Sequence, residues 1–429
     1  MRGLGKWSKK DIMASFDDWL LRQEKKLRKI PPEKRALVIL IVGVVLLGSL
    51  VTIDQLVLRD YLDQTIGPTP DVPYYRTRTQ TVLNGGWLYR DIQCESPPLI
   101  VYFMLPAQLL GGQDWTYEAY FSAFTIITAL FLYFGLREWD DYRAFMVAIL
   151  FLFLPFGTVE STFGIQDEAI VVFLFMVPLV LAMHRRLRLS ALTIAVGLWT
   201  KIFNAFFYPV LFLNTRSWRE RFVQIGIIVL VSLMVAAPFL AVAPNEFLVF
   251  PSYYFLGGGS GPTGGISIWD FLAMGGLSIP GTVLLAIVAC AFVTSLWIVY
   301  KKKLGFWEGM LVVLVAVLIV YPRTALVYYM LPATLLLLWA SEYAGIAIRC
   351  FVMYLPFAAC VAFSKSNLLG VPMIDVPWGW AAGLLLSIVG FAMLIETTLA
   401  ALKKTPFTAR NRHSQEEGPP VGIDSVPKT

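Results

Sequence analysis

The sequence predicts an all-α polytopic membrane protein with about twelve transmembrane segments, including a short hairpin, and with a long first outside loop. Three observations support this fold class. The chain is 57% hydrophobic, only 15% charged, and has a mean hydropathy of +0.67. This composition is typical of integral membrane proteins. The apolar residues also form long runs that are separated by short basic segments, as expected for spans and their connecting loops.

The basic residues define the orientation of the predicted spans. Of the 35 Lys and Arg residues, 11 fall within residues 1–35. The remaining clusters are Arg185-Arg186-Leu187-Arg188, Arg216/Arg219/Arg221, Lys301-Lys302-Lys303 and Lys403-Lys404. Because Lys and Arg concentrate in cytoplasmic loops, both termini are predicted to be cytoplasmic. Topology therefore explains the net charge of +6, and no nucleic-acid partner is expected.

The spans follow from this orientation. The first, Ala36–Ile53, leads into an outside loop over residues 54–116. The apolar stretch Leu99–Leu110 within that loop is short for a span and is predicted to be a half-buried or interfacial helix. The further predicted spans are Tyr117–Leu136, Ala144–Thr158, Ala169–Met183, Phe222–Val242, Gly281–Tyr300, Phe306–Val320, Ala325–Trp339, Arg349–Phe363 and Trp378–Ala400. Residues 189–213 lie between two inside clusters, so we expect a hairpin that turns near Lys201.

Four regions are expected along the chain. Residues 1–35 form a cytoplasmic tail with an amphipathic pattern, which indicates either a helix on the inner leaflet or a partner-binding helix. Residues 36–213 form a first membrane module with outside loops 54–116 and 159–168, and residues 214–402 a second. Residues 403–429 are a cytoplasmic tail whose Pro/Gly-rich composition predicts disorder. The four cysteines and two histidines show no disulfide framework, zinc site or catalytic histidine pattern.

Carboxylates at the predicted membrane boundary are the first candidates for function. Asp71 lies in the first outside loop, and Asp167 and Glu168 lie between two apolar runs. Ionised carboxylates are costly there unless they bind a cation, a substrate or water. Aromatic residues and amides surround Asp71, which suits a sugar, although an interfacial Trp/Tyr belt is the alternative. Asp167 and Glu168 could instead be partners of a helix dipole.

Two basic residues are the second group of candidates. Lys201 lies at the predicted tip of the hairpin, where a buried ammonium requires an anion. A lipid phosphate is one such anion, and an ion pair with Asp167 or Glu168 is the alternative. Arg323 follows Tyr321-Pro322 on the outside and is a second phosphate candidate or a headgroup contact. The loop 257–265 lacks the Lys-Ser/Thr ending of a P-loop, so we expect a gating loop there.

Four short motifs resemble the GT-C superfamily of polytopic glycosyltransferases. Asp71-Val72-Pro73-Tyr74-Tyr75-Arg76-Thr77 resembles the first-loop acidic motif of oligosaccharyltransferase catalytic subunits, and Gln166-Asp167-Glu168-Ala169-Ile170 resembles their second-loop motif. Gly86-Trp87-Leu88-Tyr89, followed by Ser96-Pro97-Pro98-Leu99, is similar to the first loop of protein O-mannosyltransferases and lipid A aminoarabinose transferases. Gly197-Leu198-Trp199-Thr200-Lys201 resembles a glycine-to-lysine segment of such enzymes. The WWDYG-type motif of oligosaccharyltransferases is absent, so transfer to asparagine is not expected.

The resemblance implies a hexosyltransferase, for mannose or another hexose, that uses a polyprenyl-phosphate or dolichyl-phosphate sugar and a lipid, glycan or protein acceptor. Its site would face outside or the lumen, in a prokaryotic plasma membrane or the endoplasmic reticulum. Asp71 would be the catalytic base of an inverting displacement. The other implied site residues are Asp167 and Glu168 at the catalytic centre, Tyr74, Tyr75, Arg76, Tyr89, Glu95 and Gln166 on substrate, and Lys201 and Arg323 on the lipid phosphate.

Two further questions stay open from sequence. Mg²⁺ or Mn²⁺ could bind Asp71, Asp167 and Glu168 through oxygen, but many relatives in the superfamily need no metal. The alternatives to an enzyme are a transporter or flippase of a lipid-linked saccharide and a non-catalytic subunit of a glycosylation complex. Because acidic residues concentrate at the predicted outer face and only Lys201 interrupts the spans, the sequence favours the enzyme.

Overall fold

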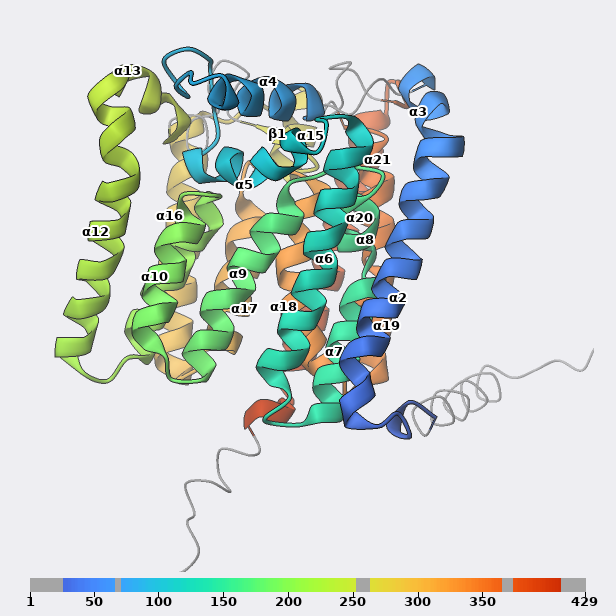
Figure 1. The fold of residues 1–429 in the computed structure, drawn as a ribbon, viewed down its shortest axis with the longest axis vertical. Helices are drawn as coiled ribbons and strands as arrows, with labels where there is room; N and C mark the ends of the chain where they lie inside the picture. The colour runs from blue at the N-terminus through green and yellow to red at the C-terminus, as the bar shows by residue number, and fades with distance from the viewer. Residues whose placement is uncertain (1–25, 66–70, 252–262, 365–372, 410–429) are drawn as a thin grey trace, which may run out of the picture.

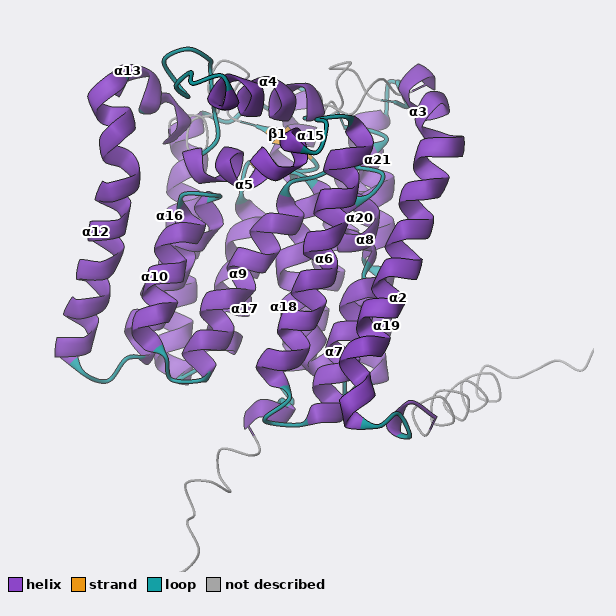
Figure 2. Cartoon of the chain, in the orientation of Figure 1, coloured by secondary structure: helices purple, strands orange, loops and turns teal. Residues whose placement is uncertain are grey.

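The structure, a computed structural model, is described over residues 26–65, 71–251, 263–364 and 373–409. Most of this part is helical (Figures 1 and 2). Most helices stand side by side in an upright bundle, and α4 and α5 lie across one of its ends (Figure 1). We call this end the site end. Residues 1–25 of the expected N-terminal amphipathic tail, and most of the expected C-terminal tail and gating loop, lie outside the described residues.

The upright elements make up most of the chain. The longer ones are α2 (Pro32–Ile53), α6 (Asp114–Leu136), α12 (Trp218–Val242), α16 (Gly281–Lys302), α17 (Phe306–Val320), α9 (Glu168–Met183) and α21 (Gly379–Leu402). The shorter ones are α3 (Arg59–Thr65), α7 (Asp141–Phe153), α8 (Pro155–Ser161), α10 (Leu187–Leu198), α11 (Phe207–Asn214), α18 (Met330–Ala340), α19 (Ala344–Val352) and α20 (Tyr354–Val361).

The remaining elements are short or lie across the site end. They are the helices α4 (Val72–Leu83), α5 (Pro98–Leu109), α13 (Pro244–Phe247) and α15 (Ile268–Met274), the π-helical turn η1 (Asp54–Leu58), the 3₁₀ turns η2 (Ile202–Phe206) and η4 (Leu326–Tyr329), and the strands β1 (Gly264–Gly265) and β2 (Arg323–Thr324). The two strands pair in parallel, with Gly264 opposite Arg323.

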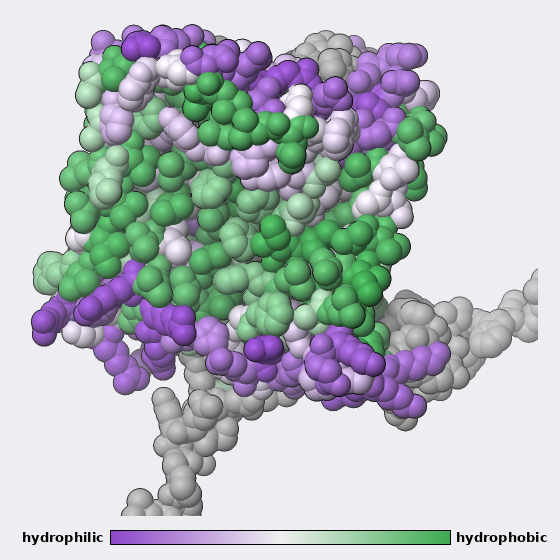
Figure 3. All heavy atoms as spheres, viewed as in Figure 1, coloured by the Kyte–Doolittle hydropathy of each residue, from purple (hydrophilic) through white to green (hydrophobic). Residues whose placement is uncertain are grey.

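The bundle has the surface of a membrane protein. Figure 3 shows a hydrophobic belt between two hydrophilic bands. In the described part of the chain, six helices are long and apolar enough to cross a membrane, and the bent pair α7–α8 would make a seventh. Six shorter apolar helices accompany them. The prediction of a polytopic all-α membrane protein is therefore confirmed.

The helix α18 forms the centre of the bundle. Every residue of Met330–Ala340 is buried. A helix that is apolar on all sides is stable only when other helices surround it. The helices α7, α8, α9, α17, α19 and α21 all contact it. This packing leaves the polar side chains of the chain to gather at the two ends of the bundle.

Two predicted features of the site end have the expected form. The interfacial helix predicted at Leu99–Leu110 is α5, which lies across the bundle rather than along it (Figure 1). The predicted hairpin is α10, a turn at Trp199–Lys201, and η2 with α11. The asparagine side chain of Asn204 packs against Gly197, where an added Cβ would lie 2.5 Å from it. A larger residue at position 197 would therefore push the two arms of the hairpin apart.

The first span differs from the prediction. We expected it to end at Ile53, but the helix continues through η1 and α3, and Pro32–Gln64 forms one helical stretch. The polar residues Asp54 and Arg59 do not end the helix because they form an ion pair and are both buried. Leu56 and Val57, on the other side of the turn, are exposed apolar residues. The expected outside loop therefore begins about a dozen residues later than residue 54.

Candidate active site

Asp71 stands directly before α4, at the edge of the site end. Pro73 lies in the first turn of this helix, where its missing N–H is tolerated and its fixed φ favours a helix start. The Asp71 carboxylate is half-buried and accepts a hydrogen bond from the side-chain amide of Gln166, with 3.2 Å between Nε2 and Oδ2. The first-loop and second-loop acidic motifs therefore meet in space.

The second motif lies in a tight connection between α8 and α9. Ile165 is fully buried and has a positive φ of 46°. For a β-branched residue this left-handed conformation is strained, so the surrounding contacts must maintain it. Backbone hydrogen bonds run from Ile165 N to Thr162 O at 3.0 Å and from Gln166 N to Glu160 O at 3.1 Å. The loop thereby directs Gln166 toward Asp71 and leaves Asp167 and Glu168 at the start of α9.

Lys201 joins the hairpin to the same acidic residues. Its Nζ lies 2.8 Å from Oε1 of Glu168 and 3.3 Å from Oδ1 of Asp167. The side chain of Lys201 is only 10% exposed, and the two carboxylates are buried. The ion pair with Asp167 and Glu168, which the sequence left open as an alternative, is thus present. One ammonium thus faces two carboxyl groups.

Tyr75 and Leu99 connect the first loop to this centre. The phenol oxygen of Tyr75 accepts a hydrogen bond from the backbone N–H of Asp167 at 3.4 Å. The backbone N–H of Leu99, at the start of α5, donates to the carbonyl of Trp199 at 2.9 Å, two residues before Lys201. Both motifs of the first loop therefore contact elements that carry the acidic residues or the lysine.

The electrostatics of Asp71 suit a base. Burial raises the pKa of the Asp71 carboxyl above its ordinary value, and the neighbouring Asp167 carboxylate raises it further. The Lys201 ammonium, the hydrogen bond from Gln166 and the Arg78 guanidinium lower the same pKa, but do not cancel the rise. Burial and the nearby carboxylates also raise the pKa of Tyr75, so its phenol keeps its proton. A carboxylate with a raised pKa is a stronger proton acceptor.

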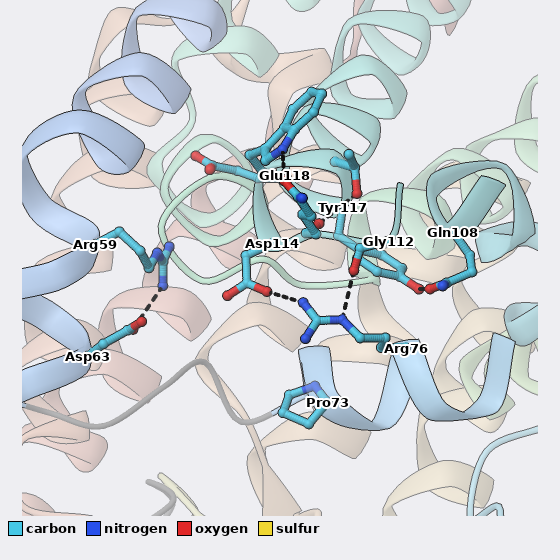
Figure 4. Close-up of polar contacts among 12 residues, drawn as sticks. Arg59, Asp63, Pro73, Arg76, Gln108, Gly112, Asp114, Tyr117 and Glu118 are labelled. Atoms are coloured by element: carbon cyan, nitrogen blue, oxygen red, sulfur yellow. Dashed lines mark hydrogen bonds and ion pairs between the residues drawn. The ribbon is translucent and has the colours of Figure 1, made fainter. Parts of the chain in front are cut away.

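Several of the predicted site residues contact other parts of the site end. The guanidinium of Arg76 donates to the carbonyl of Gly112 at 2.7 Å and to Asp114 at 2.6 Å (Figure 4). Tyr74 is 56% exposed, and its ring lies 5.4 Å from the guanidinium carbon of Arg78. The contacts of Arg76 join α4 to the start of α6, whereas the contact between Tyr74 and Arg78 lies within α4 itself.

Tyr89 and Glu95 lie farther along the first loop. The Tyr89 ring is buried against the rings of Phe239 and Phe247, and its hydroxyl donates to the carbonyl of Ser96 at 2.7 Å. Glu95 forms an ion pair with Arg78. Since Arg78 also acts on the pKa of Asp71, Glu95 is connected to Asp71 through one intervening guanidinium.

Arg323 is part of the small parallel sheet. Its side chain passes Gly264, where an added Cβ would lie 3.5 Å from Nε. Tyr321 and Tyr328, which flank this segment, both pack edge-to-face against Phe203 in the hairpin, at centroid distances of 6.4 and 4.8 Å. Tyr328 also lies 5.9 Å from Nζ of Lys201. The segment that carries Arg323 thus packs beside the Lys201 turn.

Sequence reasoning missed two polar residues of the hairpin. Trp199 Nε1 and the side-chain amide of Asn204 are buried, and neither has a hydrogen-bond partner within the described ranges. Buried donors without partners are rare because each costs about 1–3 kcal/mol. The available signal was the position of Trp199 within the glycine-to-lysine segment and of Asn204 three residues after it. The described residues also contain no group of three acidic, His or Cys side chains that could hold a metal ion.

Fold and site together show a polytopic membrane protein that brings Asp71, Gln166, Asp167, Glu168 and Lys201 together at one end of a helical bundle. Residues 96–301, just under half of the chain, match the model of glycosyltransferase family 87. The match confirms the expected GT-C type, and the protein is a membrane glycosyltransferase. No curated protein matches the chain. The matched segment includes Gln166, Asp167, Glu168 and Lys201, but neither Asp71 nor Arg323.

Proposed function

We propose that the protein transfers a hexose from a polyprenyl-phosphate carrier to an acceptor hydroxyl at the outer or lumenal face of the membrane. The observation that carries this proposal is the contact between the two acidic loops, in which Gln166 binds Asp71 while Asp167 and Glu168 bind Lys201. The Asp71 carboxylate is thereby left beside the Gln166 amide, and the Lys201 ammonium is close enough to lower its pKa. This is the arrangement that a glycosyl transfer with a basic carboxylate requires.

Asp71 is the proposed base. Its carboxylate accepts the proton of the acceptor hydroxyl as the hydroxyl oxygen attacks the anomeric carbon. The bond between that carbon and the phosphate oxygen breaks, and both electrons stay on the phosphate. A single displacement inverts the anomeric configuration. The transition state resembles an oxocarbenium ion, as in glycoside hydrolysis.

Lys201 is the proposed partner of the departing phosphate, with Arg323 as a second cation. A phosphate that leaves as an anion needs little protonation, so fixed positive charge and hydrogen-bond donors stabilise it. The buried N–H groups of Trp199 and Asn204 lie in and beside the same turn and are further candidate donors. Asp167 and Glu168 hold the lysine in place and contribute to acceptor binding.

The remaining assignments extend the same proposal. Tyr74, Tyr75, Arg76, Tyr89, Glu95 and Gln166 form the substrate side of the site, directly or by holding α4 and the first loop. The chain has about twelve membrane segments, if the short apolar helices also lie within the bilayer. Residues 36–213 are the catalytic module, residues 214–402 support it, and both termini are cytoplasmic.

The test is a transfer assay with purified protein in lipid. Labelled polyprenyl-phosphate sugars are supplied one at a time with a mixed extract of lipid, glycan and protein acceptors, beside the Asp71→Asn variant. We expect wild type to consume one donor and the variant to be slower by about 10²–10⁴-fold, the usual contribution of a general base. Transfer at the wild-type rate by the folded variant would contradict the role of Asp71. Intact donors throughout would contradict the proposed donor class.

A further inference from the structure

A buried ion pair lies at the π-helical turn of the first long helix. Asp54 is fully buried and Arg59 is 7% exposed. The guanidinium binds Oδ2 of Asp54 through Nε at 2.9 Å and through Nη2. The turn between them is π-helical, and the backbone N–H of Arg59 donates to the carbonyl of Asp54. This wider turn places the two side chains on the same face of the helix, directed into the protein.

The same guanidinium reaches the second acidic loop. Nη2 of Arg59 donates to the backbone carbonyl of Phe163 at 3.1 Å, across 104 positions of sequence. Phe163 lies two residues before the strained Ile165 and three before Gln166. In Figure 4 Arg59 projects inward from its helix, beside Asp63 and toward the start of α6. The contact with Phe163 therefore ties the first membrane helix to the loop that carries Gln166 and Asp167.

The energetics argue for a role other than stability. A buried ion pair must offset the cost of removing two charges from water, and apolar residues of similar volume are often as stable. The pair would therefore be a poor choice for joining helices. A guanidinium with a fixed, planar set of donors is, however, well suited to hold one carbonyl in a defined place. The strained backbone of Ile165 needs such a constraint.

We infer that Arg59 is a positioning residue for the reaction, oriented by Asp54, and that it acts through the Phe163 carbonyl. It holds the loop 162–168 in the conformation that directs Gln166 to Asp71 and Asp167 to Lys201. π-Helical turns within α-helices occur frequently at functional sites. Here the turn is what presents Arg59 to the loop. The expected effect of Arg59 on transfer rests on the proposed function. Its expected effect on the loop does not.

The decisive variant removes both charges. Asp54→Leu with Arg59→Met removes the buried pair and takes away the 3.9 Å contact of Arg59 with Asp63, whose side chain is 35% exposed, so the protein is expected to fold with nearly wild-type thermal stability. The contact with Phe163 is lost. We expect faster hydrogen exchange of the amides of residues 162–168, and a kcat reduced on the order of 100-fold with little change in the KM for donor, because small misplacements of catalytic groups have effects of this size.

The conservative variant Arg59→Lys keeps the buried charge but lacks the planar set of donors, and it replaces the double variant if that one unfolds. It should show a smaller loss of kcat and a smaller rise in exchange. The matched control is Arg349→Gln with Glu396→Gln, which removes an exposed ion pair on α19 and α21. This control should change neither quantity.

Wild-type kcat and wild-type exchange of the loop in a folded Arg59 variant would overturn the inference. The two proposals fail separately. If Asp71→Asn transfers sugar normally while the Arg59 variants loosen the loop, the role of Asp71 is wrong and the positioning by Arg59 stands. If Asp71→Asn is inactive while the Arg59 variants leave the loop and kcat unchanged, the reverse holds.

Discussion

The side-chain amide of Gln166 donates a hydrogen bond to Oδ2 of Asp71 at 3.2 Å, although 95 positions of sequence separate the two residues. This bond joins the two acidic loops of the chain at one end of a membrane bundle. It also affects the chemistry of Asp71, because a hydrogen bond to the charged form of a carboxylate lowers its pKa. Four predictions concern this centre.

The first prediction is the pH dependence of transfer. Because burial and Asp167 raise the pKa of Asp71, kcat/KM should fall with decreasing pH through a value above the ordinary aspartate pKa of about 4. Asp167→Asn removes one of the two raising effects, so the acid limb should move to lower pH. The measurement is the pH profile of kcat/KM for both proteins. Coincident acid limbs would rule out Asp71 as the titrating base.

The second prediction has the opposite sign. Gln166→Leu removes the hydrogen bond that stabilises the ionised form of Asp71, so the pKa of Asp71 should rise and the acid limb should move to higher pH. At neutral pH the variant should be slower, and raising the pH should recover part of the loss. The same pH profile checks this. A loss that is equal at every pH would indicate that Gln166 acts only by contact with substrate.

The stability of the base gives the third prediction. A carboxyl whose folded pKa is raised contributes stability that is complete below the unfolded pKa of about 4 and is lost as pH rises through the folded pKa. At neutral pH, ionised Asp71 therefore opposes folding. Asp71→Asn should unfold at the wild-type temperature or above it near pH 7, although it is inactive. Thermal unfolding in detergent is the measurement, and a lower unfolding temperature would show that the charge of Asp71 supports the fold.

The fourth prediction concerns Lys201. Lys201→Met leaves the buried Asp167 and Glu168 carboxylates without their cation, which should cost about 3–5 kcal/mol of stability. Adding Asp167→Asn and Glu168→Gln to Lys201→Met removes all three charges and should recover most of that stability. Transfer should stay lost, because the cation for the phosphate is still missing. Recovery of transfer together with stability would mean that Lys201 only balances the two carboxylates.

Much of the fold could be predicted from sequence because the bilayer acts locally. The length of an apolar run determines whether it can span the bilayer. The basic residues close to the ends of the runs determine which loops are cytoplasmic. The interfacial helix α5 and the hairpin that turns at Lys201 followed from these two properties. The end of the first span could not be predicted in this way. Charged residues such as Asp54 and Arg59 are typical of a loop, and only the structure shows that the two form an ion pair.

The site divides in the same way. Sequence alone determined that Asp71, Gln166, Asp167, Glu168 and Lys201 were candidates, because charged and amide groups beside apolar runs are costly unless used. The tertiary structure alone decided which of them meet: Gln166 with Asp71, and Lys201 with both carboxylates. It also decided that Arg76 binds Gly112 and Asp114, and that Arg59 reaches Phe163. Such pairings depend on how distant helices pack, and no local pattern of residues encodes that packing.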